Sequence, residues 1–389
     1  MAEWGYLGEE LDGLRQKGLL RQIPWIEGPV GPRVRMGGRE VILLCSNDYL
    51  GISQSPALAK AAKEAMEKWG CGAPASRSIA GSLGIHRELE EELAQLKGTS
   101  SALLFSTGYM ANIGLLTTLL REGDLILSDE LNHASIVDGC RLSRAEVWIY
   151  RHRDMDHLAE LLRRSNHRRR LIVTDGVFSM EGDIAPLREI KELAGQYDAF
   201  VMLDDAHATG VLGREGRGTA EHFGLLGQIE VQMGTLGKAL GVMGAFVAGE
   251  RVLIDYLINR CRPFMYTTSP PPPLVAMSKA ALKVMREEGW RRERLWENTR
   301  RLREGLRELG FRVRGETPIV PVLIGDNRLV MEASRRLLEL GVFVQGIRPP
   351  TVPEGASRLR VSVSASHGDQ EIEEALEAFR QVGEELRLI

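Results

Sequence analysis

The stretch LDDAHATGVLGREGRGTAEHFGLLGQIEVQMGTLGKALG, residues 203–241, holds an Asp-x-x-His pair and a glycine-flanked lysine within one segment. Asp204 closes an apolar run, so its carboxylate is predicted to end a buried strand and to need a cationic or hydrogen-bonding partner. A protonated pyridine nitrogen would be one such partner; the alternatives are a histidine-capped turn or a metal site, which would want more ligands than Asp-x-x-His supplies. Lys238 lies in an apolar setting that favours a nucleophilic amine, with a structural lysine as the alternative.

Short apolar runs alternate with amphipathic stretches on both sides of this segment, which predicts a parallel sheet with helices on both faces. The predicted strands are SALLF (101–105), DLILS (124–128), VWIY (147–150), LIVTD (171–175), FVMLDD (200–205) and GAFVAG (244–249). Ligands bind such sheets at the carboxyl ends of the strands. One of these ends, FSTGYMANIG (105–114), leads into a predicted helix whose free N–H groups favour a phosphate, with a simply capped helix as the alternative.

The proline run SPPPPL (269–274) predicts a junction, because consecutive prolines do not fit a helix interior or a central strand. After it, amphipathic helices and the strands 319–325, 342–347 and 358–365 indicate a smaller α+β domain. The first 40 or so residues show no strand partner nearby. We therefore expect three parts: an N-terminal segment (1–45) that packs on the small domain, a large domain (46–270) and a small C-terminal domain (271–389).

Overall composition excludes several classes of partner. The chain has 389 residues and a formal net charge of -3, which gives no reason to expect a nucleic acid or an acidic membrane as partner. Four scattered cysteines, an N-terminus with acidic residues and no apolar core, and the absence of an apolar run of about 20 residues predict a soluble, cytoplasmic protein.

Six segments together resemble the α-oxoamine synthases, a family of pyridoxal-phosphate enzymes. They are SNDYLG (46–51), DELNHASIVDG (129–139), TDGVFSMEGDIAPL (174–187), LDDAHATGVLG (203–213), GTLGKALG (234–241) and PPTVPEGASRLRVSVSASH (349–367). The resemblance runs from about residue 40 to the C-terminus. It implies the α/β fold type I of aspartate aminotransferase, with pyridoxal 5'-phosphate as cofactor and no metal.

The family pattern also assigns roles around the cofactor ring. It implies that Lys238 carries the cofactor as a Schiff base and that Asp204 meets the pyridine nitrogen. His207 would bond the phenolic oxygen and His133 would stack on the ring. Ser179 would lie near the phenolic oxygen or the substrate carbonyl.

The cofactor's phosphate has its own implied partners. Gly108, Tyr109 and Thr235 would contact it within one chain. Thr267 and Thr268 would reach the phosphate of a neighbouring subunit, which implies a homodimer. The chain departs from the family pattern at Pro74 and Ala75, where glycines are more usual.

The family reaction is a decarboxylative condensation of an amino acid with an acyl thioester. CSNDYLG, GIRPPTVPEG and RLRVSVSASH favour the biotin-pathway version, in which L-alanine joins a pimeloyl group carried by coenzyme A or a carrier protein. TDGVFSMEGDIAPL fits the version that joins glycine and acetyl-CoA at least as well. Asn47 and Arg360 would bind the amino-acid carboxylate, and Arg21 and Thr351 the acyl substrate. The alternative to an enzyme is a non-catalytic partner subunit that keeps this fold.

Overall fold

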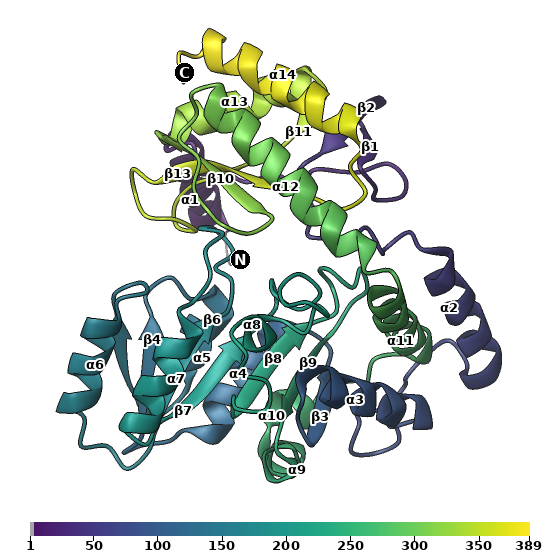
Figure 1. Cartoon of the computed structure of the whole chain (residues 1–389), viewed down its shortest axis with the longest axis vertical. Helices are drawn as coiled ribbons and strands as arrows, with labels where there is room; N and C mark the ends of the chain where they lie inside the picture. Colours follow the sequence, from purple (N-terminus) through teal and green to yellow (C-terminus); the bar gives the residue numbers. More distant parts are fainter. Residues whose placement is uncertain (1–3) are drawn as a thin grey trace. The chain divides into compact units, whose positions relative to one another are not determined.

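The computed structural model describes residues 4–389 and divides the chain into two compact units (Figure 1). The large unit comprises Asn47–Ser179 and Asp183–Glu293. The small unit comprises residues 4–46 together with Met180–Gly182 and Arg294–Ile389. None of the helices within residues 4–389 combines the length and the apolar character that a bilayer crossing requires.

A seven-stranded sheet forms the centre of the large unit, in the order β3-β9-β8-β7-β6-β4-β5. All strands run parallel except β9, which is antiparallel to both of its neighbours. The prediction of an α/β unit with a mostly parallel sheet is therefore confirmed. The strands are β3 (Ser101–Phe105), β4 (Leu125–Asp129), β5 (Glu146–Tyr150), β6 (Arg170–Asp175), β7 (Phe200–Asp204), β8 (Val231–Thr235) and β9 (Ala245–Gly249).

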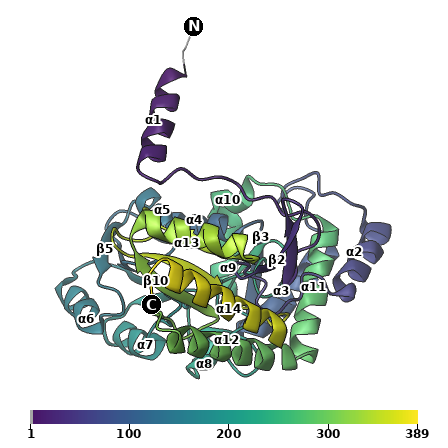
Figure 2. The same ribbon diagram turned by 90° about the horizontal axis from the view of Figure 1, so that it is seen from above.

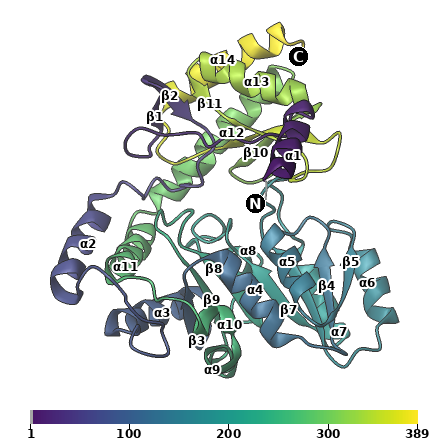
Figure 3. The same cartoon turned by 180° about the vertical axis from the view of Figure 1, so that it is seen from behind.

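Helices cover both faces of this sheet because its apolar side chains alternate between the two faces. In β6, Leu171 and Val173 pack into one core cluster and Ile172 into the other. Figure 1 shows α6 and α7 on the near side of the sheet, and Figure 3, seen from behind, shows α4 and α5. These helices are α4 (Gly108–Leu119), α5 (Ala134–Leu142), α6 (Met155–Arg164) and α7 (Leu187–Gln196).

Strand β8 is absent from the predicted strands although it leads directly to Lys238. Its sequence, VQMGT, lacks a continuous apolar run because Gln232 and Gly234 interrupt it. The polar Gln232 is nevertheless fully buried, and its amide donates a 3.2 Å hydrogen bond to the carbonyl of Lys97. A polar side chain whose amide N–H is hydrogen-bonded can therefore occupy a central strand that hydropathy alone does not identify.

The boundary predicted at residues 270/271 is wrong, since the division between the units falls after Glu293. Helix α11 (Pro272–Glu287) begins in the proline run, with proline in its first turn, where the missing N–H costs nothing. It packs against α2 (Pro56–Trp69) and α3 (Gly84–Lys97) of the large unit. The remaining helices of this part of the chain are α8 (Thr219–His222), α9 (Arg251–Arg260), α10 (Arg262–Met265) and α12 (Trp290–Glu308), which continues into the small unit.

The small unit contains two short sheets. In one, β13 (Ser357–Ser362) lies between β10 (Ile319–Gly325) and β12 (Gln345–Ile347), and all pairs are antiparallel. In the other, β2 (Arg39–Leu43) pairs with β1 (Arg33–Met36) and, in parallel, with β11 (Val342–Phe343). The expectation that the first 40 or so residues lack a strand partner is therefore wrong. The β1–β2 hairpin, which turns at Gly37 and Gly38, did carry a local signal, whereas the pairing of β2 with β11 is distant in sequence.

Helices cover one side of the small unit's sheets. Figure 2 shows α13 (Asn327–Glu339) and α14 (Asp369–Glu385) over β10, and side chains of both helices share a core cluster with that strand. Helix α1 (Gly5–Gln16) stands away from them and has no buried residue. The chain after α1 is held by Arg348, which donates hydrogen bonds of 2.7 and 2.8 Å to the carbonyls of Gly18 and Leu20.

Candidate active site

Two carboxylates lie next to each other at the carboxyl ends of β6 and β7. Asp175 and Asp204 are register partners, and both are buried. The side-chain amide of Asn112, from α4, donates a 2.8 Å hydrogen bond to Oδ2 of Asp204, and the N–H of Ala206 donates to its Oδ1 at 3.0 Å. The N–H of His133 donates to Oδ2 of Asp175 at 2.8 Å. Fixed donors therefore orient both carboxylates.

This pair creates a demand for positive charge. Burial and the charge of Asp204 raise the pKa of Asp175 well above its usual range. Two adjacent buried carboxylates do not both ionise readily unless a cation compensates them. A protonated ring nitrogen held by Asp204 would meet that demand.

His133 and Lys238 lie within electrostatic reach of these carboxylates. Burial lowers the pKa of His133, and the charge of Lys238 lowers it too, whereas Asp204 acts in the opposite direction. The charge of Lys238 also counteracts the rise in the pKa of Asp175. Nδ1 of His133 accepts a 3.2 Å hydrogen bond from the N–H of Ser135, which leaves the proton of the neutral ring on Nε2. The structure thus brings together the predicted Lys238, Asp204 and His133.

The turn that carries Lys238 follows β8 directly. The N–H of Gly241 donates a 2.9 Å hydrogen bond to the carbonyl of Lys238 and closes the turn. Gly241 has a φ of 65°, and a Cβ there would lie 2.5 Å from the nitrogen of Ser53. Only glycine fits this position, which is why GKALG forms a compact turn instead of prolonging the strand.

His207 is positioned by Tyr49. The Tyr49 hydroxyl lies 2.8 Å from Nδ1 of His207 and 3.3 Å from Oδ1 of Asn47, and Tyr49 is fully buried. A buried ion pair holds Asp205, two residues before His207. Nζ of Lys97 lies 2.7 Å from Oδ2 of Asp205, and both side chains are inaccessible to solvent.

The start of α4 is the segment for which the sequence predicts a phosphate cradle. Thr107 caps the helix and accepts a 3.2 Å hydrogen bond from the N–H of Met110. A Cβ on Gly108 would lie 2.8 Å from the methyl group of Thr235, so glycine keeps this helix end open. Tyr109 is 45% exposed and bonds Asp138 through its hydroxyl. Helix N-termini of this kind favour anions.

Thr268 lies beside the start of α4 of the same chain. Its carbonyl accepts a 3.3 Å hydrogen bond from the Ser106 hydroxyl, and it forms an isolated bridge with Ser76. Thr267 precedes it, directly before the proline run. Ser179 lies in the loop that the Val177–Ile184 bridge closes.

The comparisons with known proteins agree with this geometry. The family model of aminotransferase class I and II matches residues 39–379. The 8-amino-7-oxononanoate synthase of Symbiobacterium thermophilum is 51% identical, and 8-amino-7-oxononanoate synthase 1 of Bacillus subtilis is 47% identical. The first alignment covers 100% of both chains, and the second covers 100% of this chain and 99% of the relative.

The chain belongs to the 8-amino-7-oxononanoate synthase family. Among solved structures, serine palmitoyltransferase from S. paucimobilis with a bound PLP–myriocin aldimine has a TM-score of 0.94 at 36% identity, over 99% of this chain and 98% of that one. The 8-amino-7-oxononanoate synthase of Francisella tularensis has a TM-score of 0.76 at 29% identity, over 88% and 97%. The prediction of a fold-type-I pyridoxal-phosphate enzyme of the α-oxoamine synthase kind is confirmed.

The residues present fit pyridoxal phosphate. The buried carboxylate of Asp204 would take the pyridinium nitrogen, the cradle at Gly108 and Thr235 the phosphate, and Lys238 the aldehyde carbon. Asn112 supports the fit, because its amide is committed to Asp204 while its side-chain oxygen is buried without a hydrogen-bond partner. Residues 4–389 contain no group of three or more His, Cys, Asp or Glu side chains that could hold a metal ion.

Three of the family's predicted substrate residues lie in the small unit. Nη2 of Arg21 donates a 3.0 Å hydrogen bond to the Thr351 hydroxyl, so the structure brings these two together across 330 positions of sequence. Arg360 lies on β13, is buried, and bonds the Ser362 hydroxyl at 2.8 Å. The fourth, Asn47, begins the large unit next to Tyr49.

Sequence reasoning did not assign Asn112 or Tyr49 to the site. Asn112 is a polar residue in an otherwise apolar helix, YMANIGLL, and that contrast is a usable signal. Tyr49 lies inside the quoted SNDYLG segment but looks like a core aromatic residue. Its role rests on hydroxyl contacts to His207 and Asn47 that only the folded chain reveals.

Proposed function

We propose that this chain is a pyridoxal-phosphate-dependent acyltransferase that condenses L-alanine with a pimeloyl thioester. The products are 8-amino-7-oxononanoate, CO2 and the free thiol, and the reaction serves biotin synthesis. The observation that carries the chemistry is the proximity of Lys238 and His133 to the oriented carboxylate of Asp204. The choice of substrates is supported by 51% identity to a synthase of that name, against 36% to the serine palmitoyltransferase.

Bound pyridoxal phosphate supplies an electron sink for negative charge at Cα of the amino acid. Asp204 keeps the pyridine nitrogen protonated. The amine of Lys238 accepts the Cα proton and later returns a proton to that carbon. His133 covers the ring, and its Nε2–H can stabilise negative charge that develops on an oxygen. His207, oriented by Tyr49, binds the phenolic oxygen.

Four further residues bind the substrates. Asn47 and Arg360 bind the amino-acid carboxylate, Arg360 through its two-pronged guanidinium. Arg21 binds the distal carboxylate of the pimeloyl chain, and Thr351, already bonded to Arg21, orients it. Ser179 contacts the phenolic oxygen or the substrate carbonyl.

The enzyme acts as a cytoplasmic homodimer in which Thr267 and Thr268 also reach the partner subunit's phosphate. The proposal of a dimer rests on the family resemblance. An isologous two-fold interface would complete both active sites at once. Sedimentation of the holoenzyme tests it. An active monomer at assay concentration would contradict this arrangement.

A second candidate is condensation with L-serine, which the 0.94 TM-score to serine palmitoyltransferase favours. The deciding experiment crosses L-alanine, L-serine and glycine with pimeloyl, palmitoyl and acetyl thioesters and identifies products by mass. We expect a single dominant product from L-alanine and the pimeloyl thioester. Serine with palmitoyl, or glycine with acetyl, would reassign the substrate. No product, together with no visible absorbance of bound cofactor, would indicate a non-catalytic partner subunit.

A further inference from the structure

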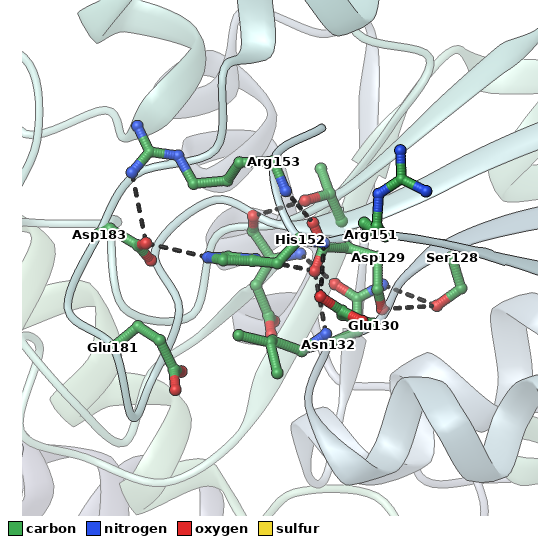
Figure 4. A network of polar contacts seen from close by, with 12 residues as sticks. Ser128, Asp129, Glu130, Asn132, Arg151, His152, Arg153, Glu181 and Asp183 are labelled. Atoms are coloured by element: carbon green, nitrogen blue, oxygen red, sulfur yellow. Dashed lines mark hydrogen bonds and ion pairs between the residues drawn. The ribbon is translucent and has the colours of Figure 1, made fainter. Parts of the chain in front are cut away.

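His152 lies between two carboxylates that come from different segments of the large unit. It follows β5 by two residues, and its side chain is 17% exposed. Nδ1 lies 2.9 Å from Oδ1 of Asp129, and Nε2 lies 2.9 Å from Oδ2 of Asp183 (Figure 4). Each ring nitrogen therefore has one carboxylate oxygen as its hydrogen-bond partner.

This geometry requires a charged ring. An ionised carboxylate only accepts hydrogen bonds, and a neutral imidazole carries a single N–H donor. Two carboxylate partners therefore call for both nitrogens to be protonated. Burial alone lowers the pKa of His152, but the hydrogen bonds to Asp129 and Asp183 outweigh burial and raise the pKa to about 9.

Two further charged residues, Arg153 and Glu130, contact His152 or its carboxylate partners. Arg153 donates a 3.3 Å hydrogen bond to the same Oδ2 of Asp183, and Glu130 accepts a 2.8 Å hydrogen bond from the N–H of His152. Arg153 also has a φ of 56°, which is uncommon for a residue other than glycine, while its N–H donates to Asp129 at 3.1 Å. Several contacts thus hold this turn in one conformation.

The two carboxylates belong to the two loops that carry His133 and Ser179. Asp129 ends β4, and its Oδ1 accepts a 2.9 Å hydrogen bond from the N–H of Leu131, two residues before His133. The carbonyl of Asp183 accepts a 3.1 Å hydrogen bond from the N–H of Phe178, which precedes Ser179. The His152 ring also stands edge-on to Phe178, with 4.4 Å between ring centroids.

We propose that His152 is a positioning residue whose imidazolium joins the Asp129–His133 loop to the Phe178–Asp183 loop and so fixes the cofactor ring between them. This inference rests on the proposed function, because the two loops carry residues of that site. His152 itself touches no reacting atom. Its loss should therefore lower kcat and change the cofactor's orientation, with little effect on the KM of the acyl substrate.

His167 offers a matched control. It has the same side-chain exposure of 17%, a 2.8 Å contact from Nε2 to Glu146, and an edge-on ring partner in Trp148. His167, however, lies near the amino end of β6, whereas the site lies at the carboxyl ends of the strands. His167→Gln should cost stability comparable to His152→Gln without disturbing the two loops.

The test compares the wild-type holoenzyme, His152→Gln and His167→Gln. Visible circular dichroism of the bound cofactor reports ring orientation, and exchange of the alanine Cα proton in D2O measures proton transfer without any acyl substrate. We expect only His152→Gln to change the dichroism and to slow exchange, by about 10- to 100-fold, as loosened positioning does. Unchanged dichroism and exchange, or equal changes in His167→Gln, would overturn the proposal.

The pH dependence of unfolding gives a readout that is independent of activity. Because the pKa of His152 is raised in the folded chain, its contribution is complete below about pH 6.5 and is lost as the pH rises through about 9. The Tm of the wild-type holoenzyme should fall between about pH 6.5 and about 9 more steeply than that of His152→Gln, and parallel curves would contradict an imidazolium.

Failure of the proposed function remains distinguishable. If the wild type ignores pimeloyl thioester, the substrate assignment fails, while dichroism, exchange and unfolding still decide the role of His152. If His152→Gln does not fold, Asp183→Ala removes the same link from the other loop, and the same readouts apply.

Discussion

The hydroxyl of Tyr49 lies 2.8 Å from Nδ1 of His207, although 158 positions separate the two residues in the chain. The contact determines which ring nitrogen of His207 remains for another partner. Because the hydroxyl occupies Nδ1, Nε2 is the ring nitrogen that faces any further partner. A buried tyrosine thus orients a side chain assigned to the cofactor's phenolic oxygen.

Tyr49→Phe removes the hydroxyl, and with it the contacts to His207 and Asn47, but keeps the ring that packs in the core. A net contribution of about 0.5–1.5 kcal/mol predicts that kcat falls about 2- to 12-fold. The cofactor should remain bound, with a shifted visible band. Tyr197→Phe, on the amino side of β7 and packed against a core cluster, is the control. Equal rates for wild type and Tyr49→Phe would remove Tyr49 from the mechanism.

Asp204→Asn should leave the fold intact and slow turnover strongly. The amide cannot keep a ring nitrogen protonated, and loss of such an electrostatic partner typically costs about 100- to 1000-fold in kcat.

Lys238→Ala should abolish turnover, because the same amine holds the cofactor and moves the Cα proton. Single-turnover rates with L-alanine measure both effects. A Lys238→Ala enzyme that keeps a substantial fraction of the wild-type rate would refute the assignment.

Burial of His367 predicts that the small unit loses stability as the pH falls, which is the acid limb of its stability profile. Nδ1 accepts a 3.0 Å hydrogen bond from the N–H of Ser364, and Nε2 lies 3.1 Å from the carbonyl of Leu43, which suits a neutral ring. Burial lowers the pKa of His367 below its usual value of 6.5. The unfolded chain therefore binds a proton that the folded chain excludes, so stability present above about pH 6.5 is lost as the pH falls.

Thermal unfolding between pH 7.5 and about 5 tests this limb. The Tm of the wild type should fall with decreasing pH more steeply than that of His367→Gln. His222→Gln, on an exposed helix end, should follow the wild type. Parallel curves for wild type and His367→Gln would show that another group controls the acid limb.

The sequence predicted those parts of the molecule whose signals are local. Asp204 and Lys238 stand in a motif at a strand end, and the structure places both beside His133. The pairing of β2 with β11 and the contact between Arg21 and Thr351 join residues about 300 positions apart, and such contacts leave no local pattern. Gln232 shows the converse case, because a buried polar residue, held through its side-chain N–H, hides a strand from hydropathy. His152 escaped prediction for the same reason as Tyr49, since its partners come from other strands.

The contact between Arg21 and Thr351 makes the choice of acyl substrate testable. A terminal carboxylate on the acyl chain needs a cationic partner, and the guanidinium offers a fork of donors that matches it. Acetyl-CoA carries no such carboxylate and would gain nothing from Arg21. A charge-assisted hydrogen bond contributes about 1.5–3 kcal/mol, so Arg21→Ala should lose about 10- to 150-fold in kcat/KM for the pimeloyl thioester and little for an acetyl thioester.

Two further variants separate recognition from folding. Arg15→Ala removes an exposed arginine of α1 whose partner is Asp12, and it should leave the selectivity unchanged. Thr351→Val removes only the hydroxyl that holds Arg21, so its loss for the pimeloyl thioester should be smaller than that of Arg21→Ala. Equal losses for both thioesters in Arg21→Ala would mean that Arg21 stabilises the N-terminal segment and does not recognise substrate. In that case the bond to Thr351 would be a structural tie, and the carboxylate of the acyl chain would have to find its partner elsewhere.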